Sequence, residues 1–168
     1  MHRKATVLFF LVLVFGPVPL LCQGSTPSVA KEVGGNFVDI NCKVLDMAKD
    51  FPEEKYDFRL KPEMRSVHDL LVHIASGNVY AARAGRGEKV KWDELNPKDY
   101  PTKAAVVALF EKSAADAATV LKSWPETQFA KTAEPWIDVM EHSAEHYGLL
   151  VAYYRANGLV PPESRPKK

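Results

Sequence analysis

The sequence lacks an excess of charge of either sign. Its 168 residues include 22 Lys and Arg against 21 Asp and Glu, and these charges are spread along the chain. Proteins that bind nucleic acid usually gather a basic patch or stripe, because they must neutralise phosphate groups. The even distribution of charge therefore argues against nucleic acid as a partner. The length suits one domain, and the 46% hydrophobic content is too high for a disordered chain.

Cysteine is nearly absent. Of the two cysteines, Cys22 falls in an apolar N-terminal segment and Cys42 stands alone in the rest of the chain. A lone cysteine excludes an intramolecular disulfide once that segment is removed. Cys42 can be interpreted as a reactive thiol or as a small buried hydrophobe, and its place in an apolar-periodic stretch favours burial.

The sequence also lacks an apolar run long enough to span a membrane. The run at residues 5–15 follows basic residues and precedes two prolines, and it is shorter than the roughly 20 residues of a spanning helix. This pattern is typical of a secretory signal peptide. We therefore expect residues 1–24 to be a signal peptide, with cleavage after Gly24 or Ala30. The mature protein is expected to be exported, periplasmic or secreted, and free of a membrane anchor.

No stretch alternates strictly between apolar and polar residues, and no segment repeats. The absence of alternation argues against β-strands. Apolar residues instead recur at helical spacing in four segments, at about 28–49, 66–84, 101–124 and 132–158. Four long helices predict an all-α four-helix bundle over residues 25–160. Residues 161–168, rich in Pro and Lys, are expected to form a flexible C-terminal tail.

Local signals predict where these helices begin and end. Ser66 followed by Asp69 is a capping-box signature at the start of the second helix. Pro101 suits the first turn of the third helix. Thr132 is a candidate N-cap of the fourth helix, and Gly158 is expected to end it.

The segment 88–99 is polar and aperiodic, which predicts a long surface connection that could cover a site. Trp92 and Leu95 are its candidate anchors onto the domain. Basic residues gather around it, where they either attract an anionic substrate or form a solvated loop, and the second interpretation is favoured. These basic residues are Arg83, Arg86, Lys89 and Lys91.

Export leaves four histidines, of which His142 and His146 are four residues apart in the fourth helix. At that spacing the two imidazoles lie about 40° apart around the helix axis and one turn apart along it. Zn²⁺ and Ni²⁺ bind neutral imidazole nitrogens, and a catalytic site adds one more protein ligand and keeps a position for water. The pair therefore predicts a divalent-metal site. Acidic residues on the adjacent polar side suggest that water reaches it, namely Asp138, Glu141 and Glu145.

Spacing does not identify the third ligand. His68 and His73 are five residues apart in the second helix, so their side chains point about 140° apart and at most one faces the fourth helix. Both flank the apolar stripe of that helix, on opposite sides. The choice between them stays open on spacing alone.

Five stretches together resemble the DinB-like superfamily over about residues 29–164. They are 52–58 (PEEKYDF), 61–67 (KPEMRSV), 70–75 (LLVHIA), 142–148 (HSAEHYG) and 154–162 (YRANGLVPP). The resemblance implies a four-helix bundle that holds zinc or nickel with one histidine of the second helix and an H-x-x-x-H pair of the last. It thereby implies His73, His142 and His146 as ligands and leaves His68 as an exposed residue near the helix cap.

Characterised members of that superfamily include transferases and isomerases that use low-molecular-weight thiols. The resemblance therefore implies a metal-dependent hydrolase or thiol transferase acting on a small molecule, with the metal activating water or a thiol. Glu145, next to His146, is a candidate general base. The alternative is an exported helical binding or stress-related module with a structural metal or none. Related bundles often pair, so a homodimer is an open alternative to a monomer.

Overall fold

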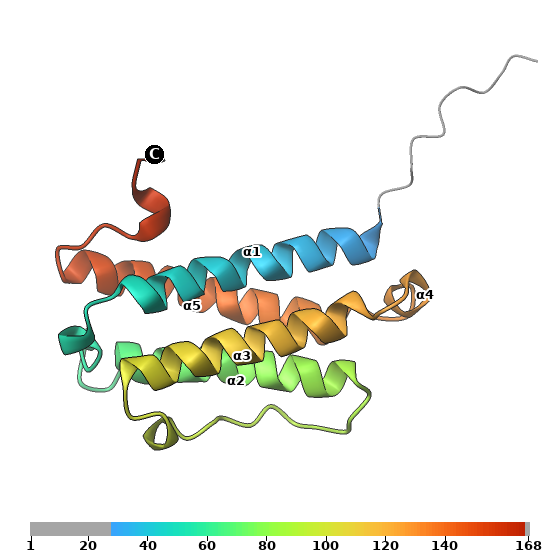
Figure 1. Cartoon of the computed structure of the whole chain (residues 1–168), viewed down its shortest axis with the longest axis horizontal. Coiled ribbons are helices and arrows are strands. Elements are labelled where there is room, and N and C mark those ends of the chain that lie inside the picture. Colours follow the sequence, from blue (N-terminus) through green and yellow to red (C-terminus); the bar gives the residue numbers. More distant parts are fainter. Residues whose placement is uncertain (1–27, 167–168) are drawn as a thin grey trace, which may run out of the picture.

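The computed structural model describes residues 28–166, so the expected signal peptide at 1–24 lies outside the described part. The described residues form helices and connections without a strand, which confirms the predicted all-α bundle (Figure 1). Its long helices are α1 (Val29–Asp50), α2 (Val67–Gly85), α3 (Lys103–Lys122) and α5 (Trp136–Ala156). Its short helical elements are η1 (Glu53–Lys55), η2 (Pro97–Asp99), α4 (Glu126–Phe129) and η3 (Pro162–Ser164). None of the described helices combines the length and apolar character that crossing a membrane requires.

The four long helices lie side by side with α1 and α2 on one diagonal and α3 and α5 on the other. Helix α1 packs against α3 and α5, and α2 packs against the same two helices. The bundle therefore has lateral seams where neighbouring helices meet (Figure 1). Two of them, the α1–α3 seam and the α2–α5 seam, lie on opposite sides of the bundle.

The core is built from the apolar stripes that the periodicity predicted. On α1, Phe37 and Val44 are fully buried, as is Trp136 at the start of α5. Phe37 meets the ring of Trp136 edge-on at a centroid distance of 6.0 Å, and Trp124 does so at 5.4 Å. Aromatic side chains of this size bury large apolar areas, so they supply much of the packing that holds the helices in place.

Two predicted helix starts differ from the structure, whereas the predicted cap at Ser66 is present. The Ser66 hydroxyl accepts the backbone N–H of Asp69 at 3.1 Å. Pro101 precedes α3, because the Thr102 hydroxyl accepts the N–H of Ala105 and starts the helix at Lys103. Likewise, the expected cap Thr132 does not begin α5. Its hydroxyl accepts the N–H of residue 134 at 3.0 Å, which forms a local turn, and α5 starts at Trp136.

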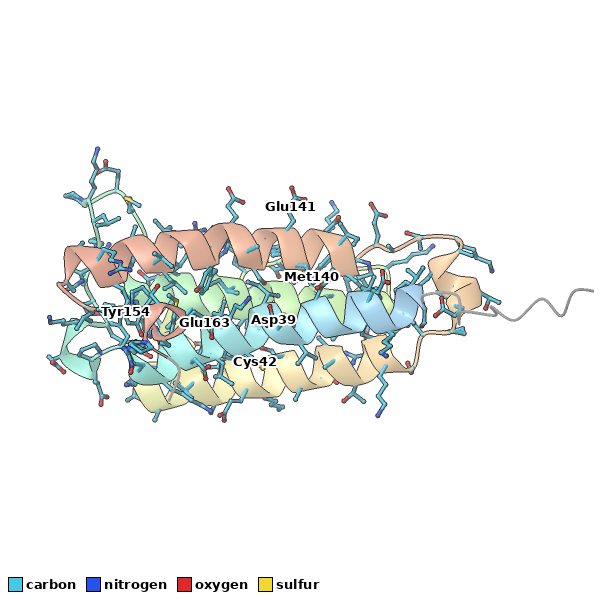
Figure 2. The ribbon with its side chains drawn as sticks, turned by 90° about the horizontal axis from the view of Figure 1, so that it is seen from above. Asp39, Cys42, Met140, Glu141, Tyr154 and Glu163 are labelled. Atoms are coloured by element: carbon cyan, nitrogen blue, oxygen red, sulfur yellow. The ribbon has the colours of Figure 1, made fainter. Side chains whose placement is uncertain are left out.

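The interpretation of Cys42 as a buried hydrophobe is wrong. Cys42 is exposed and lies between α1 and α3 (Figure 2). It lines a hollow on the α1–α3 seam. The physical reason is its position around α1. Val44 and Phe37 define the inward face of this helix, and Cys42 lies about 160° and 140° away from them at 100° per residue.

Part of the expected C-terminal tail lies against the bundle. Helix η3 packs on α1, and the Arg165 guanidinium donates to the Asp50 carboxylate at 2.8 Å. The same guanidinium lowers the pKa of Asp50, mainly through its hydrogen bond. Asp50 also accepts the Tyr154 hydroxyl at 3.2 Å. Charge and packing thus hold this segment through Arg165, although its composition suggested a free tail.

Candidate metal centre

Three histidine rings from two helices meet at the α2–α5 seam. Helix α2 presents His73, and consecutive turns of α5 present His142 and His146. The Nε2 atom of His73 lies 2.9 Å from Nε2 of His142 and 3.0 Å from Nε2 of His146. The three side chains form a group that could hold a metal ion, with ligand atoms within 4.8 Å of one another. The i,i+4 spacing of His142 and His146 on α5 therefore brings their two rings together, as the sequence predicted.

Of the two histidines on α2, the structure brings His73 into this group and leaves His68 out. His68 is not the exposed residue that the resemblance implied, because only 15% of its side chain is accessible. Its Nε2 lies 2.8 Å from the carbonyl oxygen of Tyr100, and its Nδ1 lies 3.2 Å from the Asp69 carboxylate. His68 thus joins the start of α2 to the chain that leads into α3.

The donor set of this group fits a divalent cation. A neutral imidazole carries one N–H and one free lone pair. The Nε2 of His73 faces two other Nε2 atoms at 2.9 and 3.0 Å, and it can make a hydrogen bond with only one of them. A cation that accepts a lone pair from each ring would satisfy all three nitrogens. Sets of imidazole ligands are typical of zinc and nickel sites.

Burial keeps these rings in the neutral form that binds metal. Desolvation is the largest cause of the shift in all three, and it lowers the pKa of His142 to about 3. It also lowers the pKa values of His73 and His146. The positive charge of Arg65 lowers the pKa of each ring further. Metal binding therefore does not require the loss of protons from these side chains near neutral pH.

Two charged residues beside the rings were not identified from the sequence. Glu94, in the connection between α2 and α3, places Oε1 3.1 Å from Nδ1 of His73. Nδ1 of His73 makes no hydrogen bond with the described residues in this structure. The same oxygen accepts the Arg65 guanidinium at 2.8 Å. The Tyr153 hydroxyl donates to the Arg65 carbonyl at 2.6 Å, which ties this pair to α5. The only sequence signal was that the connection could cover a site.

The connection does cover one side of the histidine group. Trp92 meets the ring of His142 edge-on at a centroid distance of 4.6 Å and lies 5.1 Å from the ring of Tyr80. Gly77 on α2 makes room for it, because a Cβ atom there would lie 2.7 Å from the Trp92 ring. Trp92 therefore shields this side of the rings from water.

Glu145 lies apart from these contacts. It is exposed, and no hydrogen bond or ion pair found among residues 28–166 involves it. Its charge still acts on His146, whose pKa it raises against the larger effect of burial. Glu141, one turn earlier, projects from α5 away from the other helices (Figure 2). The role of Glu145 as a base stays a prediction.

Two of the four basic residues near the connection, Arg83 and Arg86, form surface ion pairs. Arg83 donates to Glu88 at 2.8 Å, and Arg86 donates to Asp116 at 3.0 Å. All four side chains are between 41% and 53% accessible. Such pairs contribute little to stability, and their mutual neutralisation supports the interpretation as a solvated surface.

Comparison with known proteins assigns the chain to a family. No curated protein matches the chain. A family model described as the DinB superfamily matches residues 43–154, from the middle of α1 to near the end of α5. The matched part exceeds half of the chain and includes all three histidines. The chain therefore belongs to the DinB superfamily.

Proposed function

We propose that this protein is a divalent-metal-dependent enzyme, of the hydrolase or thiol transferase class, that acts on a small molecule. His73, His142 and His146 are its metal ligands, and zinc or nickel is the metal. The observation that carries the proposal is the convergence of three neutral Nε2 atoms, with separations of 2.9 and 3.0 Å from His73 to its neighbours. Three protein ligands are typical of catalytic metal sites, whereas structural zinc sites usually have four.

The residues around the rings have separate tasks in this proposal. The cation, when bound, would supply Lewis-acid chemistry that lowers the pKa of water or a thiol. The histidines hold it without giving up protons, and Trp92 excludes water on the side of the connection. Glu145 faces solvent, so it would serve as a base only for a substrate proton on the outer side of α5.

The competing function is an exported helical module without catalysis, in which the metal is structural or absent. A structural site would be expected to add a fourth protein ligand, and the group found among the described residues contains three. This difference favours the enzyme. Both proposals include export, which is inferred from the sequence of residues 1–24 alone.

The test is the metal content of the purified chain, prepared without a metal-binding tag. Mass spectrometry should find close to one zinc or nickel per chain in the wild type, and loss in His73→Ala, His142→Ala and His146→Ala. The control is His68→Ala, which removes a histidine of the same helix and should keep the metal. Absence of metal after reconstitution, or equal loss in the control, would contradict the proposal. A positive result then justifies assays with hydrolase and thiol-transfer substrates.

A further inference from the structure

The outer nitrogen of His73 has an unusual position. Nδ1 is buried and has no hydrogen-bond partner among the described residues, yet the Glu94 carboxylate lies 3.1 Å from it. A buried N–H without a partner is costly, so a small rotation of Glu94 that completes the bond is favourable. The Glu94 side chain is 51% accessible and has room for such a rotation. Nδ1 of His142 is also buried without a partner among the described residues, and none of the ion pairs found in residues 28–166 involves it.

We propose that Glu94 is a positioning residue, which accepts the N–H of His73 Nδ1 and thereby keeps the Nε2 lone pair of His73 directed at the metal. A neutral imidazole has a single N–H, and the nitrogen that carries it cannot bind a cation. A carboxylate beside Nδ1 holds the proton there, which fixes the tautomer and makes Nε2 a better donor. This inference rests on the proposed metal function.

The chain holds Glu94 in place from both sides. The Arg65 guanidinium donates to the same carboxylate oxygen at 2.8 Å. The next residue, Leu95, donates its backbone N–H to the hydroxyl of Ser76 at 3.0 Å, and Ser76 is 1% exposed. Trp92, two residues earlier, packs against His142. The connection is therefore anchored on either side of Glu94, so that its carboxylate stays close to His73.

A simpler interpretation is that Glu94 and Arg65 form an ordinary surface ion pair. Their side chains are 51% and 44% accessible, and exposed pairs of this kind contribute little. That interpretation predicts no effect of Glu94 on metal affinity or on the tautomer of His73. The two interpretations are therefore separable by experiment.

The first measurement is Zn²⁺ affinity, by competition with a chromophoric chelator, for the wild type, Glu94→Ala, Glu94→Gln and Asp93→Asn. Loss of the carboxylate that orients a ligand typically weakens metal binding about 10- to 100-fold, and we expect this for Glu94→Ala. Glu94→Gln keeps an oxygen that can accept the N–H, so its loss should be smaller. Asp93 is exposed and adjacent. Asp93→Asn removes the same charge from the same connection and should stay within about threefold of the wild type.

The second measurement uses the metal-free protein, where long-range ¹H–¹⁵N NMR correlations identify the tautomer of each histidine. His73 should carry its proton on Nδ1 in the wild type and become a mixture of tautomers in Glu94→Ala, while His68 stays unchanged. Wild-type affinity in both Glu94 variants, an equal loss in Asp93→Asn, or an unchanged His73 tautomer would each overturn the inference alone. A wild type that binds neither Zn²⁺ nor Ni²⁺ would instead overturn the proposed function and this inference with it.

Discussion

The α1–α3 seam and the α2–α5 seam lie on opposite sides of one bundle and are closed by different kinds of side chain. The α1–α3 seam is lined mainly by small or apolar residues and has two adjacent hollows of about 420 and 220 Å³. The α2–α5 seam has the three histidine rings and is covered by Trp92. The same helical periodicity builds both seams. The location of a seam thus follows from packing, whereas its chemistry follows from a few residues at its margin.

The two seams also differ in how their buried polar atoms are satisfied. Beside the α1–α3 hollows, the Asn41 amide donates to the carbonyl of Phe37 at 2.9 Å, and its oxygen accepts the amide of Asn78 at 2.7 Å. Among the described residues, Oδ1 of Asn78 is the one atom of this contact without a partner, whereas at the α2–α5 seam the Nδ1 atoms of both His73 and His142 are buried without one. Unsatisfied buried groups cost free energy, and those of the α2–α5 seam belong to the rings that could hold a metal ion.

In the metal-free protein, we expect low pH to give the largest difference between the two seams in their contributions to folding stability. The folded-state pKa of His142 is about 3, whereas the unfolded value is near 6.5. As the pH falls below 6.5, the unfolded chain binds a proton that the folded chain does not, so stability is lost between about pH 6.5 and pH 3. Each such proton contributes about 1.4 kcal/mol per pH unit. Burial lowers the pKa values of His73 and His146 too, which adds loss in the same direction.

Urea unfolding followed by circular dichroism at several pH values measures this loss. His142→Leu removes one titrating ring and should reduce the slope of stability against pH by up to one proton. Cys42→Ala, on the opposite seam, should leave the slope as in the wild type. Identical slopes in the wild type and His142→Leu would show that this histidine does not carry the expected acid sensitivity.

The fold could be predicted from the sequence because helix packing requires apolar residues at regular spacing and capping residues at the helix ends. Phe37 and Val44 recur at the spacing that buries one side of α1, and the cap at Ser66 is formed by residues three apart. The expectation for Cys42 was wrong although the signal was local, because Cys42 belongs to an apolar-periodic stretch but lies about 160° and 140° around α1 from Val44 and Phe37. The expectation of a free tail depended on a distant residue, since Arg165 is held by Asp50, 115 residues away.

The candidate site likewise contains residues that could be predicted from the sequence and residues that could not. The pair His142 and His146 follows from i,i+4 geometry, which is a property of one helix. The choice of His73 over His68 needed the family resemblance, because both flank the apolar stripe of α2. Glu94 and Arg65 could not be found, since they lie in two connections 29 residues apart and meet only in the folded chain. Such a contact produces no periodic pattern in the sequence.

Gly77→Ala tests how tightly the covered seam is packed. The new Cβ would lie 2.7 Å from the Trp92 ring and 3.1 Å from Val139, so one of them must move. Overpacking of this kind costs about 1–3 kcal/mol, and the better helix propensity of alanine offsets about 0.5–1 kcal/mol of it. We expect a net loss of up to about 2.5 kcal/mol in urea unfolding, together with a change in tryptophan fluorescence as Trp92 leaves His142.

A second substitution separates this steric effect from a general weakness of α2. Trp92→Leu removes the ring that the new methyl group meets. In the Trp92→Leu background, Gly77→Ala should therefore cost less than it does in the wild type. An equal cost in both backgrounds would mean that the contact with Trp92 is not the source of the loss.

Gly34→Ala makes the same change at the α1–α3 seam, and its effect should have the opposite sign. Gly34 lies within α1 and lines the larger hollow, and a Cβ atom there would meet nothing within 4 Å. Alanine loses less backbone entropy than glycine in a helix, so we expect a gain of about 0.5–1 kcal/mol in urea unfolding.

Gly35→Ala is the matched control, because a Cβ there also meets nothing within 4 Å and this glycine is not among the residues that line the hollow. If Gly34→Ala destabilised the protein while Gly35→Ala stabilised it, the hollow would have to be occupied in solution. A second copy of the chain would then be the first occupant to test, by measuring molecular mass for both variants.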